Sequence, residues 1–174
     1  MRLRLVVLAL ILILFIVPLG VGYATAPCDG FGEPVVLSPY RLRQQRFLQD
    51  AGRWAEDVQQ VGETLHTVAY GPQPQSTSAA FRLAEQVGQA ASRLDTLLPL
   101  EAPAEYSLLA LTMDQARDTY AYAAEQLLVF YGNNAPQALA EAQESLRLAA
   151  LALDDVQAGI RGLTYPLCRE VWRE

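Results

Sequence analysis

Residues 40–68 read YRLRQQRFLQDAGRWAEDVQQVGETLHTV, and apolar or small side chains recur there at alternating intervals of three and four positions. That spacing places the side chains in one stripe along one side of an α-helix. Three later segments repeat the rhythm. The four stripes are Tyr40, Phe47, Ala51, Trp54, Val58, Val61, Leu65 and Val68; Ala80, Ala84, Val87, Ala91, Leu94 and Leu98; Tyr106, Leu109, Met113, Ala116, Tyr120, Ala123, Leu127 and Phe130; and Leu139, Ala142, Leu146, Ala149, Leu153, Val156, Ile160 and Leu163.

Short breaks that contain helix-starting and helix-stopping residues separate the four segments. Pro39 suits the first position of a helix, and Gly71 suits a helix end. Pro103 marks the start of the third helix, and Asn134 is expected to cap the start of the fourth. Connections this short force neighbouring helices to be antiparallel. We therefore expect an all-α fold, an up-down-up-down antiparallel four-helix bundle behind an N-terminal apolar helix.

The expected organisation has four parts. Residues 1–26 form a signal peptide or a transmembrane signal anchor, and residues 27–38 form an irregular linker. Residues 39–166 form the bundle, and residues 167–174 form a C-terminal tail.

The N-terminal segment MRLRLVVLALILILFIVPLGVGYATAP combines Arg2 and Arg4 with an apolar run that begins at Leu5. Three interpretations stay open: a retained membrane anchor, a signal peptide cleaved after Ala24, and a lipoprotein with lipid on Cys28. In all three the arginines stay in the cytoplasm and the bundle lies outside it. We expect an extracytoplasmic domain, anchored in the membrane or, as the alternative, secreted after cleavage.

Cys28 and Cys168 flank the periodic segments, and both ends of an up-down-up-down bundle lie at the same end. An extracytoplasmic compartment permits a disulfide, so we expect these two cysteines to be bonded. The alternatives are two free thiols, or Cys28 used for lipid. No Cys-x-x-Cys spacing supports a redox motif.

Several stripe positions are alanine, and large residues are expected to face them. By counting turns, Trp54 and Tyr120 fall at the height of Ala84 and Ala149. Large side chains opposite small ones fill space at native density, so the aromatic stripe indicates core packing rather than a pocket.

A metal or haem site has little support in the sequence. The one histidine, His66, forms a Glu-x-x-His pattern with Glu63, but a di-metal bundle needs that motif on two helices. The stripe turns both residues toward solvent. Met113 lies about 25 Å from His66 along the bundle axis, too far for the two to ligate one haem. We expect no cofactor.

Catalytic motifs are also missing from the sequence: no nucleophile elbow, phosphate loop or dinucleotide-binding turn occurs. Asp114 and Asp118 share a helix face beside Arg117, where a solvated face is expected and a weak divalent-ion site is the alternative. The sequence therefore predicts a protein that is not an enzyme.

The chain carries a net charge of −6, which disfavours nucleic acid as a partner. Arg41, Arg43 and Arg46 nevertheless crowd the first turns of the first helix. Residues expected at the same end of the bundle are Arg93, Arg161, Arg169, Arg173 and Trp172. Arginine and tryptophan suit anionic headgroups, so contact with the membrane through Arg41, Arg43, Arg46 and Trp172 is one hypothesis. Pairing with carboxylates inside the domain is the other.

These features predict a membrane-anchored extracytoplasmic bundle that binds or scaffolds a protein partner in the envelope. A small-ligand or sensor module is the first alternative, although fold analogy alone is weak support for it. A metal or haem carrier is the second.

Overall fold

The computed structural model describes Cys28, residues 39–97 and residues 99–164. The chain divides into two compact units, residues 1–42 with 164–174, and residues 43–163. The helices are α2 (Pro39–Tyr70), α3 (Thr77–Thr96), α4 (Ser107–Asn133) and α5 (Pro136–Leu163), and a single 3-10 turn, η1 (Ala104–Tyr106), precedes α4.

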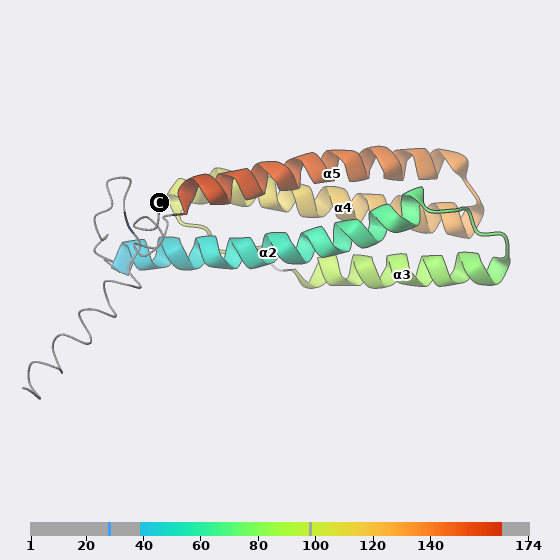
Figure 1. Cartoon of the computed structure of the whole chain (residues 1–174), viewed down its shortest axis with the longest axis horizontal. Coiled ribbons are helices and arrows are strands. Elements are labelled where there is room, and N and C mark those ends of the chain that lie inside the picture. Colours follow the sequence, from blue (N-terminus) through green and yellow to red (C-terminus); the bar gives the residue numbers. More distant parts are fainter. Residues whose placement is uncertain (1–27, 29–38, 98, 165–174) are drawn as a thin grey trace, which may run out of the picture. The chain divides into compact units, whose positions relative to one another are not determined.

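In the unit of residues 43–163, consecutive helices run in opposite directions (Figure 1). Four helices packed against one another confirm the expected all-α fold for the described residues. α4 packs against both α3 and α5. The expected N-terminal apolar helix lies outside the described residues.

The helix ends follow local hydrogen-bonding chemistry. The Ser76 hydroxyl accepts from the backbone N–H of Ala79 at 3.2 Å and so caps the start of α3. Asn134 adopts a left-handed conformation with φ 51° and ψ 44°, and its N–H donates to the carbonyl of Phe130 at 2.7 Å. Asn134 therefore ends α4, and the expectation that it caps the start of the fourth helix is wrong. Left-handed backbone is tolerated by asparagine better than by most residues, which suits it to this position.

Most of the predicted stripe is buried. On α2, every stripe residue from Phe47 to Val68 is buried, and on α4 the same holds from Met113 to Phe130. The exceptions include Tyr40 and Leu163, which are exposed at helix ends, and half-buried positions such as Ala84 and Ala91 of α3. Apolar burial along these stripes is the main source of stability for the fold.

α3 is shorter than the other helices, with 20 residues against 27 or more. It buries only Val87, Ala90 and Leu94. Beyond its end, the connection to α4 covers the core instead, and the rings of Tyr106 and Phe47 stack with centroids 5.5 Å apart. Partly buried residues of this connection that pack against the core are Leu97, Leu100 and Ala102.

The short helix α3 changes the register that the sequence suggested. Val61 and Val68 of α2 line the same groove as Ala90 and Arg93 of α3. Because the helices are antiparallel, residues before Gln86 lie beside the end of α2 past Val68. Ala84 therefore lies beside the last turns of α2, whereas Trp54 lies two turns before Val61. The expected pairing of Trp54 with Ala84 is therefore wrong.

The ring of Tyr120 faces a small residue on α2, Gly62. A Cβ added to Gly62 would lie 2.7 Å from the ring carbon Cζ of Tyr120 and 2.8 Å from its hydroxyl. The ring of Tyr120 thus lies directly against the backbone of α2. The principle of large against small holds for this pair, with glycine as the small partner.

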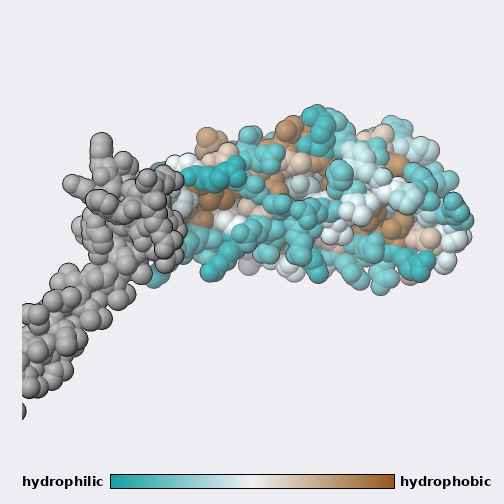
Figure 2. Space-filling view, viewed as in Figure 1, coloured by the Kyte–Doolittle hydropathy of each residue, from teal (hydrophilic) through white to brown (hydrophobic). Residues whose placement is uncertain are grey.

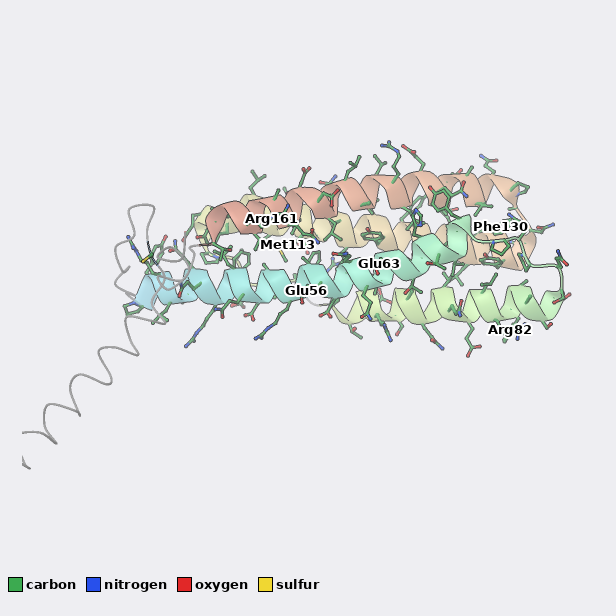
Figure 3. The ribbon with its side chains drawn as sticks, viewed as in Figure 1. Glu56, Glu63, Arg82, Met113, Phe130 and Arg161 are labelled. Atoms are coloured by element: carbon green, nitrogen blue, oxygen red, sulfur yellow. The ribbon has the colours of Figure 1, made fainter. Side chains whose placement is uncertain are left out.

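Polar contacts join α2 to α5. Gln157 donates to the amide oxygen of Gln59 at 2.9 Å, and Gln143 donates to the carbonyl of Ala69 at 3.0 Å. Figure 3 shows Met113 of α4 and Arg161 of α5 toward one end of the helix pair, and Phe130 toward the other. The start of α4 and the end of α5 therefore lie at the same end of the pair, as expected for antiparallel neighbours.

Candidate functional site

The structure describes only one of the two cysteines of the predicted disulfide, Cys28. The Cys28 side chain is fully buried. Cys168 lies outside the described residues, so the bond between the two stays a prediction.

The expected membrane-facing arginines lie on the first turns of α2. Arg41, Arg43 and Arg46 are all exposed, and Trp172 lies outside the described residues. Arg93 does not join them, because it lines a groove beside Val61. Val61 lies about 22 Å along α2 from Arg46, at 1.5 Å per residue.

His66 and Glu63 are both exposed, as the stripe predicted. The His66 ring stacks on the ring of Tyr70 with centroids 4.3 Å apart. Met113 is buried in the core. Within the described residues, no group of three or more His, Cys, Asp or Glu side chains comes close enough to hold a metal ion.

Arg117 occupies the centre of the face that the sequence marked through Asp114 and Asp118. It donates to Asp118 at 2.9 Å, lies 3.7 Å from Asp114 and donates to the carbonyl of Leu97 at 3.3 Å. Leu97 ends α3, so the guanidinium satisfies a terminal carbonyl and complements the negative end of the helix dipole. The two carboxylates therefore face a cation of the protein itself. A hollow of about 290 Å³ adjoins this cluster and is also lined by Asp95 and Ala121.

A second hollow of about 340 Å³ runs between α2 and α3. Its apolar floor is Val61, Val68 and Ala90. Thr64 and Thr67 donate their hydroxyl protons to carbonyls of their own helix, so only acceptor lone pairs remain for a ligand. The polar side chains contributed by α3 are Gln86, Gln89 and Arg93. The volume lies at the lower limit for a small-ligand pocket.

The outer face of α4 exposes apolar side chains that the stripe analysis did not find. Leu108 and Leu111 are 74% and 64% exposed, and Tyr122 and Val129 follow at intervals of eleven and seven residues. Those intervals keep all four on one side of the helix. In the sequence, these residues form a second apolar set on α4, at positions between those of the buried stripe.

The outer face of α5 continues this surface. Leu148 and Leu151 are exposed and lie three residues apart. The hydroxyl of Tyr122 donates to Glu141 at 3.3 Å, and Glu141 lies two turns before Leu148 on the same side of α5. Loss of hydration and then the carboxylate of Glu141 raise the pKa of Tyr122 above its ordinary value of 10.0. This contact makes one continuous surface of the two helix faces. Figure 2 shows apolar patches over α5 among hydrophilic ones.

We name this surface the α4–α5 face and define it by six exposed apolar residues. They are Leu108, Leu111, Tyr122, Val129, Leu148 and Leu151.

Charge is distributed unevenly among the helices. α2 has four arginines and four carboxylates, and α3 has two of each, so both are balanced. α4 and α5 together carry seven carboxylates against three arginines, a net charge of −4. Three of these carboxylates are exposed on the same side as the α4–α5 face: Glu125, Glu141 and Asp155. Arg147 is already paired with Glu144 at 2.6 Å, and this hydrogen bond holds the pKa of Glu144 below its usual value.

No family model, curated protein or solved structure matches this chain. Among the residues that the structure describes, no helix has both the length and the apolarity needed to cross a bilayer. The segment proposed as an anchor, residues 1–26, lies outside them.

Proposed function

We propose that the protein is a non-enzymatic binding or scaffolding module, held at the outer side of a membrane by its N-terminal segment, and that its ligand is another protein. The observation that carries the proposal is the α4–α5 face. The core already buries its own stripe residues, so these six apolar side chains are not needed to complete it. Grouped apolar surface of this kind marks interaction sites.

The sidedness part of the proposal rests on the sequence. Arg2 and Arg4 precede the apolar run, which favours a bundle outside the cytoplasm. Protease added to intact cells or spheroplasts should degrade the bundle, and alkaline carbonate washing should leave the chain in the membrane pellet. Release into the supernatant would favour secretion over anchoring.

Partner binding can be tested with the full chain as bait. After chemical cross-linking in membranes of the source cell, the purified bait should carry a specific protein that a misfolded control, Leu127→Asp, does not. Leu127 is fully buried, so a charge there unfolds the bundle. Identical captured proteins for both baits, or none for either, would contradict the proposal.

The hollow between α2 and α3 favours a second candidate function, small-ligand binding. Arg93 and the amides of Gln86 and Gln89 are suited to a small polar anion such as a carboxylate. Thermal melts of the full chain with a panel of carboxylic acids should then show stabilisation that Arg93→Gln abolishes. Unchanged melting with every acid would remove this candidate.

A further inference from the structure

We infer that the α4–α5 face docks a basic amphipathic helical segment of a partner protein. This inference rests on the proposed function and specifies the chemistry of the partner.

The apolar side chains of the face are arranged to receive a helix. Leu108 and Leu111 are one turn apart on α4, and Leu148 and Leu151 are one turn apart on α5. The Tyr122–Glu141 contact joins the two helices at the surface. Two neighbouring helices with exposed leucines form the type of groove into which an amphipathic helix places its apolar face.

The length of the face matches one helix. Leu108 and Val129, the outermost members of the face on α4, are 21 residues apart, about 32 Å along the helix at 1.5 Å per residue. A partner helix of about six turns would span that distance. Its anchors would recur every three or four residues.

The charge of the face selects among occupants. The helices that carry it have a net charge of −4, whereas α2 and α3 are balanced. A second copy of this chain would bring like charge against like charge, and an anionic bilayer would be repelled for the same reason. A segment with arginine or lysine beside its apolar stripe would pair with carboxylates such as Glu125 and Asp155.

The test uses two synthetic helical peptides as probes, one with leucine and arginine faces and one with leucine and glutamate faces. The full chain is held in neutral-lipid nanodiscs, and binding to empty nanodiscs is subtracted. We expect the arginine peptide to bind at least about tenfold more tightly than the glutamate peptide, and added salt to reduce the difference. Equal binding of the two peptides would overturn the inference.

Matched variants locate the binding surface. Leu111→Ser with Leu148→Ser and Leu151→Ser should weaken the arginine peptide about tenfold or more, since anchors in the centre of an interface dominate affinity. Phe81→Ser on α3 is the control, because Phe81 is 72% exposed and lies off this face. Circular dichroism confirms that each variant keeps its helices. Equal losses in the triple variant and the control would overturn the inference.

Two double variants, each lacking two carboxylates, distinguish specific docking from general attraction to an acidic protein. Glu141→Gln with Asp155→Asn removes two carboxylates from the α4–α5 face, and Glu56→Gln with Asp57→Asn removes two exposed ones from α2. Only the first pair should weaken the arginine peptide, by about three- to tenfold. Equal weakening by both pairs would overturn the inference.

Repeating the membrane cross-linking experiment with the leucine triple variant as bait tests this inference separately from the proposed function. Loss of that protein with the leucine triple variant supports docking at the α4–α5 face. Capture that survives the triple variant overturns the docking site while the proposed function stands.

Discussion

The ring of Tyr120 on α4 lies against the backbone of Gly62 on α2, at a distance that leaves no room for a methyl group. An added Cβ would lie 2.7 Å from Cζ and 2.8 Å from the hydroxyl oxygen, both inside van der Waals contact. Glycine within a helix costs about 0.5–1 kcal/mol relative to alanine. At Gly62 the close approach of an aromatic ring offsets that cost.

We expect Gly62→Ala to lower the free energy of unfolding by about 1–2 kcal/mol, because overpacking outweighs the gain in helix propensity. Gly52→Ala and Gly88→Ala are matched controls, since nothing lies within 4 Å of either added Cβ. Both should raise stability by about 0.5–1 kcal/mol. Urea unfolding measures all three, and stabilisation by Gly62→Ala would show that the ring moves aside easily.

A double variant tests whether the two residues act together. Tyr120→Leu should destabilise the bundle by itself, but it should also relieve the clash made by Gly62→Ala. The combined loss should therefore be smaller than the sum of the single losses by about 0.5 kcal/mol or more. Strict additivity would mean that the contact is not a constraint.

Trp54→Ala should cost about 3–5 kcal/mol, because Trp54 is buried and its removal leaves a cavity. His66→Ala should change stability by no more than about 0.5 kcal/mol, as expected for an exposed side chain. Thermal melts of the two variants give the ranking. A larger effect at His66 would contradict the observed orientation of α2.

Alkaline pH should destabilise the bundle partly through Tyr120. Burial, and then the carboxylates of Asp154 and Glu63, raise the pKa of this phenol above its ordinary value of 10.0. The unfolded chain therefore loses the proton first, and the free energy of unfolding falls as pH rises above the unfolded value toward the folded one. Urea titrations from about pH 8 to about pH 11 should show a shallower fall for Tyr120→Phe than for the wild type. Parallel curves would argue against this contribution.

We predict that Cys28 and Cys168 form a disulfide. Alkylation under denaturing conditions should modify neither cysteine until reductant is added. Reduction should then lower the free energy of unfolding, by about 4–5 kcal/mol in the chain-entropy model for a loop of this length. Alkylation of both thiols without reductant would disprove the bond.

The arginines at the start of α2 should give weak binding to anionic vesicles. Each is worth about 1 kcal/mol near an anionic surface, screened over a Debye length of about 10 Å at 0.1 M salt. For a fragment that begins at Pro27, first shown by circular dichroism to keep its helices, co-sedimentation with anionic vesicles should exceed that with neutral ones. Replacing Arg41, Arg43 and Arg46 with glutamine should abolish the difference. Replacing Arg93, which lies elsewhere, should leave it unchanged.

The helical class, the number of bundle helices and most of the core could be read from the chain because they depend on local periodicity. The interval of three and four places Val58, Leu65 and Leu127 inside, and all three are fully buried. Helix ends were also accessible where a single residue type has one strong preference, as at Pro39 and Gly71, since α2 begins at Pro39 and ends at Tyr70. Asn134 shows the limit of such reasoning, because asparagine suits both a helix start and a left-handed helix end.

The sequence by itself therefore determined which side of each helix is buried, since burial follows from the alternation of apolar and polar residues along one helix. Only the tertiary structure decided the register between helices, because register depends on how side chains of different segments interlock. Counting turns paired Trp54 with Ala84, but α3 ends at Thr96 and places Ala84 beside the last turns of α2 instead. The close approach of Tyr120 on α4 to Gly62 on α2 is likewise a contact between different segments. The α4–α5 face has the same origin: Leu111 and Leu151 are ordinary leucines in the chain, and they share one surface only because α4 and α5 pack side by side.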